Sequence, residues 1–224
     1  MEFKESNRML SILTNFGCHW GCRYCVYKEN GINIHTTDAR TFGWKELEEQ
    51  LLLHKGELVS ISGGGDPLYD YNKDTHRSKL FYKKLFYLLE KYNCRLELHT
   101  SMLIEEFPYD KCERVVFHLT MPTQIGLINN RLFKLPKLVR AVYVVQDYYN
   151  KGLINQIVRY VQDDNNSVNE LSFRQMIDSN GETEYYCHGY LKEYHKKLWY
   201  YIEQSDYNEY FTQDHIEKEY LNIK

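Results

Sequence analysis

Three cysteines lie close together near the N-terminus, in the stretch FGCHWGCRYCVYK. They are Cys18, Cys22 and Cys25, so half of the six cysteines of the chain fall within eight residues. Thiolates are ligands for zinc, for soft metals and for iron–sulfur clusters. A structural zinc site or an electron-transfer cluster takes four protein ligands. Three local thiols therefore predict a metal centre that keeps one coordination position open.

Two other interpretations of these thiols stay open. A zinc ion would need a remote fourth ligand, for which Cys187, His188 and His19 are the candidates. Three unligated thiols are the second alternative. Two glycines in the same loop, Gly17 and Gly21, would let the backbone wrap tightly around a ligand. The metal centre accounts for more of these residues than either alternative.

A second group of residues with chemical potential is the stretch ISGGGDPL, residues 61–68. The three glycines at 63–65 lack a Cβ, so their backbone can approach a ligand closely. An ordinary tight turn after a strand would explain the same glycines. Asp66 follows them and adds a carboxylate to the loop.

The elements that must position these motifs follow from hydrophobic periodicity. Short apolar runs predict strands at 9–16, 57–63, 94–100, 114–120, 140–146 and 169–177. Amphipathic patterns predict helices near 43–54, 75–92 and 151–162, the last with Asn150 as its N-cap. The connections 101–113 and 121–139 contain prolines and are expected to be largely irregular.

Strands that alternate with helices imply right-handed crossovers and a parallel sheet. The predicted fold is α/β, a partial (βα)6 barrel with a short C-terminal helical cap. The core is expected over 1–185, with the extension 186–224 packed on it rather than forming a separate domain. A helix is predicted at 189–204, and the tail after it is either a last helix or a lid. Both motifs follow strands, at the edge where α/β folds build their sites.

The two motifs, in this order and about 40 residues apart, resemble those of the radical S-adenosylmethionine (SAM) superfamily. The stretch CHWGCRYC is similar to that family's CxxxCxxC motif, with the aromatic Tyr24 before the last cysteine. The stretch GGGD is similar to the family's GGE motif, which contacts the amino group of SAM. Asp66 stands where the family more often has Glu. Through strand order, the resemblance extends over roughly residues 8 to 178.

The resemblance implies that Cys18, Cys22 and Cys25 bind three irons of a [4Fe-4S] cluster. The fourth iron would chelate SAM, and one electron would cleave SAM reductively. The resulting 5′-deoxyadenosyl radical would then abstract hydrogen from a substrate. In such a system the cofactor carries out the difficult chemical step, while the protein binds and orients the cofactor and the substrate and excludes water.

Further cofactor contacts are assigned from positions at strand ends. His118 and Thr120 close the fourth strand, where the family often contacts the ribose, and Gln146 ends the fifth. Arg174, near the end of the sixth, would suit a carboxylate through its two-pronged donor, or make an ordinary salt bridge. The expected cofactor-binding residues are Tyr24, Gly63, Gly64, Gly65, Asp66, His118, Thr120, Gln146 and Arg174.

Several other residues have two alternative roles each. Cys187, in YYCHG, is a candidate hydrogen donor or extra ligand, and a buried unreactive thiol is the alternative. His99 and Thr100 end the third strand and face the substrate or cap a turn. Cys94 and Cys112 precede strands and are expected to be structural thiols.

Composition narrows the partners. The net charge of −3 offers no basic field for nucleic acid or an anionic membrane. There is no apolar core of a signal peptide and no run of about 18 apolar residues. The few, unevenly spaced cysteines fit a reducing cytosol. We therefore expect a cytoplasmic protein, and the radical SAM resemblance implies a one-electron donor such as flavodoxin or ferredoxin.

The sequence gives few indications of the substrate and of the reaction outcome. Only three cysteines lie outside the triplet, which argues against an auxiliary cluster. The ring-rich segment 184–201 could stack on a flat substrate, which favours a small deazapurine- or nucleotide-like molecule. A glycyl-radical-enzyme activase and a peptide-modifying enzyme are the alternatives. A non-catalytic zinc or iron–sulfur module is the alternative of another class, and it predicts a fourth ligand at Cys187 or His188.

Overall fold

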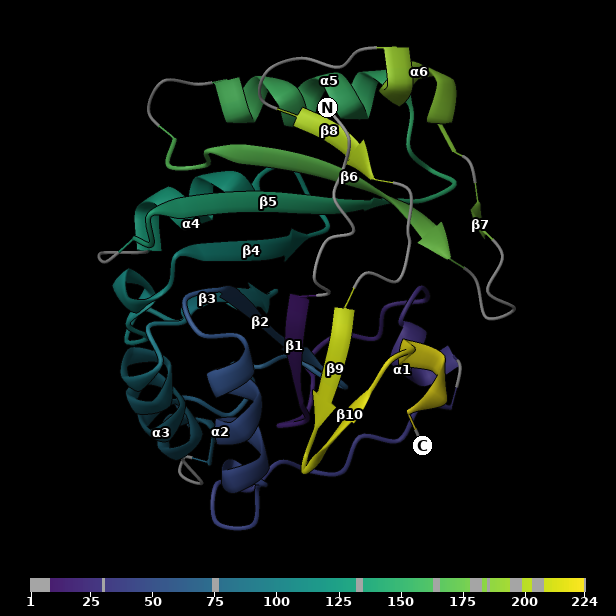
Figure 1. Ribbon diagram of the computed structural model, residues 1–224. Coiled ribbons are helices and arrows are strands. Elements are labelled where there is room, and N and C mark those ends of the chain that lie inside the picture. Colours follow the sequence, from purple (N-terminus) through teal and green to yellow (C-terminus); the bar gives the residue numbers. More distant parts are fainter. Residues whose placement is uncertain are drawn as a thin grey trace, which may run out of the picture.

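The computed structural model describes residues 9–29, 31–73, 77–131, 135–162, 166–177, 183–184, 186–193, 199–202 and 208–223. Six strands follow one another through one sheet in chain order (Figure 1). They are β1 (Met9–Thr14), β2 (Leu58–Gly63), β3 (Arg95–Thr100), β4 (Arg114–Leu119), β5 (Leu138–Val145) and β6 (Glu170–Ile177). Each pairs in parallel with the next. All six predicted strands are confirmed.

The helices between these strands agree with the prediction in three cases. They are α2 (Trp44–Leu53), α3 (Arg77–Lys91) and α5 (Lys151–Gln162). The predicted N-cap at Asn150 is confirmed, because its Oδ1 accepts the backbone N–H of Leu153 at 3.0 Å. A further helix of one turn, α1 (Val26–Glu29), follows the last cysteine of the triplet.

The connection 121–139 was expected to be irregular, and this expectation is wrong. It contains α4 (Gln124–Arg131). Pro122 lies ahead of the helix, where a missing N–H costs nothing. The Gln124 carboxamide oxygen accepts the backbone N–H groups of Thr120 and Met121, at 2.7 and 2.8 Å. In the connection 101–113, which is fully described, the only helical element is the 3-10 turn η1 (Tyr109–Lys111).

The predicted C-terminal helix 189–204 is confirmed only in its first residues. After β7 (Thr183–Glu184), the helix α6 (His188–Glu193) covers residues 189–193, whereas β8 (Trp199–Ile202) replaces the predicted helix at 199–202. Residues 194–198 and 203–204 of the predicted helix lie outside the described residues. The tail forms the hairpin β9 (Asn208–Thr212) and β10 (His215–Glu217), followed by η2 (Tyr220–Asn222). The β8 sequence WYYI favours an extended strand, and pairing with the edge strand β6 overrides its helical spacing.

These late strands extend the sheet at both edges. β9 pairs in parallel with β1, and β8 pairs in parallel with β6. The parallel strands thus run in the order β9-β1-β2-β3-β4-β5-β6-β8, with β10 and β7 antiparallel on β9 and β6. Among the described residues β8 and β9 do not pair, so the sheet is open. The protein is therefore an α/β protein with a mostly parallel, open sheet.

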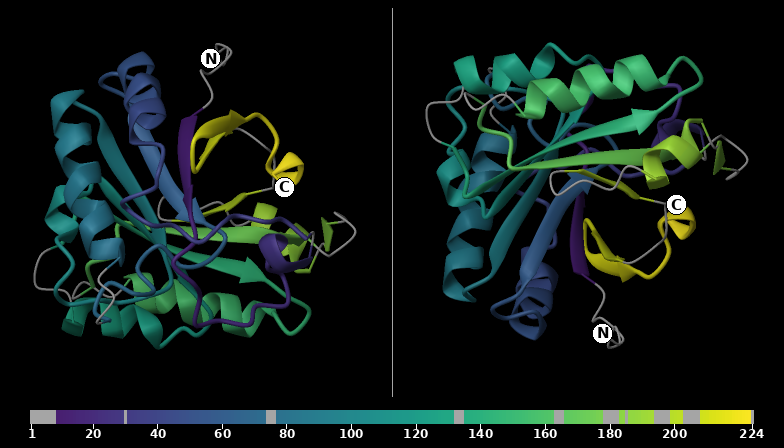
Figure 2. Two further views of the ribbon diagram at one scale, coloured as in Figure 1. Left: turned by 90° about the horizontal axis from the view of Figure 1, so that it is seen from below. Right: turned by 90° about the horizontal axis from the view of Figure 1, so that it is seen from above.

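The helices α2, α3, α4 and α5 pack on one face of this sheet, which we call the outer face (Figure 2). Figure 2 shows α2, α3, α4 and α5 on this side and the C-terminal segment on the other. Alternate strand residues pack there against the helices, including Leu98, Phe117, Tyr143 and Phe173. Because side chains alternate along a strand, the residues between them point to the opposite, inner face.

Within the part of the chain that the structure describes, none of the helices combines the length and the apolar character needed to span a bilayer.

Candidate functional site

The cysteine loop and the glycine stretch meet where β1 and β2 end. The backbone N–H of Gly64 donates to the Thr14 carbonyl at 3.0 Å, and that of Asp66 donates to the Gly17 carbonyl at 2.8 Å. A Cβ on Gly65 would collide with the same Gly17 carbonyl. The missing side chain at Gly65 therefore allows the two loops to lie in direct contact.

The Asp66 carboxylate is fully engaged by the protein. Its Oδ1 accepts the N–H of Leu68 at 2.9 Å and the hydroxyl of Thr100 at 2.7 Å. Its Oδ2 accepts both the N–H and the hydroxyl of Ser101 at 2.7 Å. Asp66 is only 4% exposed. It ties the glycine stretch to the end of β3.

The three cysteines share one loop and one electrostatic environment. Cys18 is exposed, while Cys22 and Cys25 are half-buried. The backbone N–H of Trp20 donates to the Cys18 sulfur at 3.4 Å. Burial raises the pKa of the Cys22 thiol, a hydrogen bond with Tyr24 lowers it, and the neighbouring Cys25 and Cys18 raise it further. The three thiols therefore lie within electrostatic reach of one another.

The donor chemistry of this loop fits an iron–sulfur cluster. In the described part of the chain, no three His, Cys, Asp or Glu side chains converge as ligands of a single metal ion. A four-iron cluster has a different requirement, because each of its cysteines binds a separate iron. Three soft thiols on one short loop meet that requirement by ligand type and by their common loop.

The cysteine loop crosses the carboxyl-terminal edge of the sheet. Arg23 pairs with Asp147, two residues after the end of β5, at a distance of 3.0 Å. Burial raises the pKa of the Tyr24 hydroxyl, and the nearby Tyr148, also after β5, raises it further. The loop that begins at the end of β1 thus reaches the end of β5.

The C-terminal tail packs against the same loop. Ile223 joins a small apolar cluster with Leu13, and Tyr27 and Tyr220 pack on it. Burial raises the pKa of the Tyr220 hydroxyl, and Cys25 and Tyr27 also contribute. Figure 1 shows η2 beside α1. The tail, expected as a helix or a lid, is a hairpin and a 3-10 turn docked next to the cysteines.

The inner face of β3 to β6 carries a row of polar side chains. They are Glu97 and His99 on β3, Arg114 and His118 on β4, Arg140 on β5, and Glu170, Ser172 and Arg174 on β6. Glu97 accepts from Arg114 at 2.6 Å, and Glu170 lies 3.3 Å from Arg114 and 2.7 Å from Arg140. Carboxylates and guanidinium groups therefore alternate across this face.

Two histidines extend this network. His99 Nε2 lies 2.8 Å from Glu97 Oε1, and His99 Nδ1 lies 3.2 Å from His118 Nε2. Burial opposes ionisation of Glu97, but hydrogen bonds from His99 and Arg114 outweigh it and lower the pKa of Glu97 to about 2. Burial lowers the pKa of both histidines, and the charge of Arg174 lowers both further. Arg174 therefore lies near the histidine pair.

Two other predicted cofactor contacts have partners within the protein. The Thr120 hydroxyl lies 3.3 Å from the Gln124 carboxamide oxygen, at the start of α4. The Gln146 amide donates to the Tyr148 hydroxyl at 3.2 Å, and Gln146 is 8% exposed. Their roles in cofactor binding stay predictions.

The remaining cysteines make local contacts. The Cys187 thiol donates to the Tyr149 carbonyl at 3.1 Å, and burial raises its pKa. The Cys94 thiol lies 3.4 Å from the His54 carbonyl, and Cys112 is buried. Cys187 is half-buried rather than buried, and the roles expected of these three cysteines stay predictions.

Sequence reasoning missed most of the inner-face network, in particular Glu97, Arg114, Arg140, Glu170 and Ser172. A signal was present, because the strands CRLELHT and NELSFRQMI alternate apolar and polar residues. Alternation of this kind predicts two different faces. It would have placed the polar residues of neighbouring strands together.

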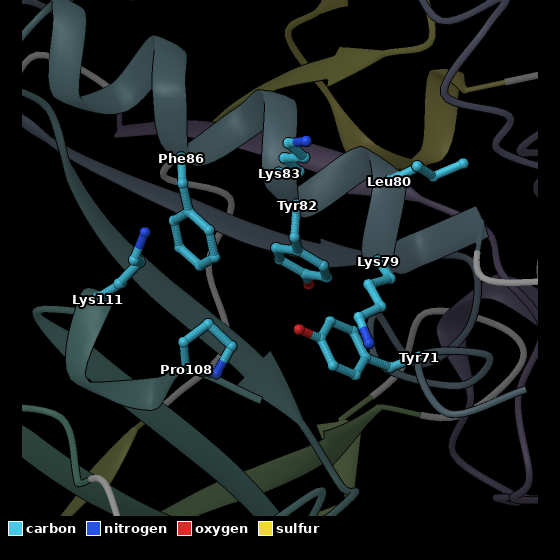
Figure 3. A pocket seen from close by; sticks show the side chains of 8 residues that line it. All are labelled: Tyr71, Lys79, Leu80, Tyr82, Lys83, Phe86, Pro108 and Lys111. Carbon is cyan, nitrogen blue, oxygen red and sulfur yellow. The ribbon is translucent and has the colours of Figure 1, made fainter. Parts of the chain in front are cut away.

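A surface pocket of about 520 Å³ lies apart from these residues, on the outer side of the molecule. It is lined by α3 with Tyr71, Pro108 and Lys111 (Figure 3). None of its lining residues belongs to the cysteine loop, the glycine stretch or the inner face.

The fold and the site define an α/β protein in which a cysteine loop and a glycine stretch meet at the edge of a mostly parallel sheet, and in which one face of β3 to β6 is polar. No protein-family model matches the chain, and no curated protein matches it in sequence.

Proposed function

We propose that this protein is a radical SAM enzyme. Cys18, Cys22 and Cys25 would hold three irons of a [4Fe-4S] cluster, and the glycine stretch would face SAM. When bound, the two groups supply a one-electron reductive cleavage that yields a 5′-deoxyadenosyl radical. The observation that carries the proposal is the contact between the two motifs, in which the Asp66 N–H donates to the Gly17 carbonyl at 2.8 Å.

The arrangement of the sheet supports this proposal. Six parallel strands in chain order with their helices on one face are typical of α/β barrels, whereas doubly wound sheets reverse their strand order. β9 beside β1 and β8 beside β6 continue the order that a closed barrel has. We therefore propose that the sheet is a partial barrel that is open between β8 and β9.

The residues of the chain would bind and orient the cluster and SAM and shield them from water. Asp66 holds the glycine stretch in place, so that its backbone groups face the methionyl end of SAM. The pair of Arg23 with Asp147 holds the cysteine loop across the edge of the sheet. Cys18 is exposed, which leaves the loop open on one side to a one-electron donor such as flavodoxin or ferredoxin. A small-molecule substrate and a cytoplasmic location complete the proposal.

Cluster loading after anaerobic reconstitution tests this proposal. Iron and sulfide content and the electron paramagnetic resonance of the reduced cluster are measured, with and without SAM. We expect Cys18→Ala, Cys22→Ala and Cys25→Ala each to lose the cluster. Cys187→Ala is the matched control, and it should load as the wild type does.

The same experiment distinguishes the radical SAM enzyme from the alternative of a non-catalytic zinc or iron–sulfur module. A non-catalytic module needs a fourth protein ligand, so loading would then fail in Cys187→Ala or His188→Ala. A spectrum that SAM leaves unchanged in a fully loaded protein would also favour the module. Zinc bound in place of iron would contradict the radical SAM proposal.

A further inference from the structure

The buried hydroxyl of Ser172 is the first sign of a ligand on the inner face. Ser172 is 0% exposed, and its Oγ has no hydrogen-bond partner among the described residues. A buried polar group without a partner costs free energy. The strand register places Ser172 level with His118, on either side of Val142. Arg174 follows two residues further along the same face of β6.

The hydrogen-bond chain through the two histidines fixes which ring atoms carry hydrogen. Ionised Glu97 can only accept, so His99 donates to it through Nε2–H, at 2.8 Å. In neutral His99 the other nitrogen, Nδ1, is then an acceptor. His118 therefore donates to it through Nε2–H, at 3.2 Å. The remaining nitrogen, His118 Nδ1, is left as an acceptor without hydrogen.

The position of Arg174 is the second observation. The strand register places Arg174 on the same face of β6 as Ser172, two residues further along. Its charge acts on the rings of both His99 and His118. A guanidinium presents a planar fork of donors that matches carboxylate and phosphate oxygens.

We propose that this inner face binds a substrate with an anionic oxygen group next to a hydroxyl or amine. Arg174 takes the carboxylate or phosphate, His118 Nδ1 accepts the hydrogen of the neighbouring hydroxyl or amine, and the Ser172 hydroxyl bonds to the same ligand. This inference rests on the radical SAM proposal for its assignment to the substrate. It deepens that proposal by naming the substrate class.

Isothermal titration calorimetry of the full chain, with acetate, glycolate and inorganic phosphate as probes, tests the inference. Glycolate differs from acetate by the hydroxyl that His118 would recognise. We expect glycolate to bind at least about tenfold more tightly than acetate, the ratio for one added hydrogen bond in a buried site. If phosphate binds more tightly than glycolate, the anionic group of the substrate is assigned as a phosphate. If glycolate binds more tightly, that group is assigned as a carboxylate.

Matched variants locate the contacts. Arg174→Gln should weaken the binding of glycolate and acetate alike, by about tenfold or more. His118→Gln places an amide where Nε2 contacts His99 and removes the Nδ1 acceptor, so the preference for glycolate should disappear. His118→Asn places an amide at the Nδ1 position, and part of the preference should return. Thermal unfolding confirms that each variant is folded.

Several results would overturn the inference. They are equal affinity for glycolate and acetate, unchanged affinity in Arg174→Gln, and no measurable binding of any of the three probes. Direct competition between glycolate and SAM would assign the groups to the cofactor and overturn the substrate assignment. A histidine ¹⁵N spectrum that places the hydrogen of His118 on Nδ1 would contradict the hydrogen-bond chain. The titrations involve no SAM cleavage, so their failure is distinct from failure of the radical SAM proposal.

Discussion

The two faces of β3 to β6 are built from alternate residues of the same segments, yet they differ in chemical character. The outer face presents side chains such as Leu98, Phe117 and Phe173 to the helices, and all three are fully buried. The inner face presents charged and hydroxyl groups, of which Glu97 is 4% and Ser172 is 0% exposed. Burial on the outer face drives folding, whereas burial on the inner face opposes it.

This difference indicates what each face is for. A buried ion pair is weak evidence for stability, because desolvation can cancel its attraction. The alternating network of Glu97, Arg114, Glu170 and Arg140 is therefore poorly explained as a stabilising device. Polar residues with shifted pKa values, gathered on one face of a parallel sheet, are typical of a binding site.

The largest effect on stability is expected on the outer face. Phe173→Ala removes a fully buried ring from the core and should lower the free energy of unfolding by about 3–5 kcal/mol. Urea unfolding monitored by circular dichroism measures it. A loss below about 1 kcal/mol would contradict our description of this face as the main core.

Glu97→Gln tests the charged part of the inner face. The folded pKa of about 2 lies below the ordinary value of 4.5, so above pH 4.5 the fold is more stable with Glu97 ionised than it would be with Glu97 protonated. This contribution, about 3 kcal/mol, is lost as the pH falls from 4.5 towards 2. The variant should be less stable than the wild type at pH 7, and the gap should close on acidification. A gap that is independent of pH would contradict the assigned ionisation.

His118→Gln tests the histidine pair by its pH dependence. Burial, Arg174 and His99 lower the pKa of His118 well below 6.5, with Glu97 as the opposing charge. The unfolded chain therefore takes up a proton below pH 6.5 that the folded chain does not, and stability falls as the pH decreases. The wild type should lose up to about 1.4 kcal/mol more per pH unit than the variant between pH 6 and 5. Urea unfolding across this range measures the difference, and parallel curves would contradict it.

Ser172→Ala should have the smallest effect on the free energy of unfolding, and unlike the other changes it should not lower it. Because the Ser172 hydroxyl has no hydrogen-bond partner among the described residues, its removal should leave stability unchanged or raise it by up to about 1 kcal/mol. The same change should weaken glycolate binding. A clear loss of stability would show that the hydroxyl serves the fold rather than a ligand.

Much of the central fold could be predicted because its signals are local. The strands β1 to β6 are short apolar runs, and α2, α3 and α5 carry apolar stripes with helical spacing. The meeting of the cysteine loop with the glycine stretch also follows from the sequence, because consecutive parallel strands end at the same edge.

The parts that could not be predicted depend on distant contacts or on a misread signal. Residues 199–202 have helical spacing with their neighbours, and only pairing with β6 makes them a strand. Pro122 was interpreted as a helix breaker, although it precedes α4. The inner-face network became visible only when polar residues from four strands were placed in register, since no single strand contains more than a few of them.

The most direct test of the radical SAM proposal is the formation of 5′-deoxyadenosine. The anaerobically reconstituted protein is incubated with SAM and dithionite, and the product is measured by mass spectrometry. We predict product in the wild type and in Cys187→Ala, and none in Cys22→Ala. Equal product in wild type and Cys22→Ala, or a wild type that binds zinc without iron and forms no product, would contradict the proposal.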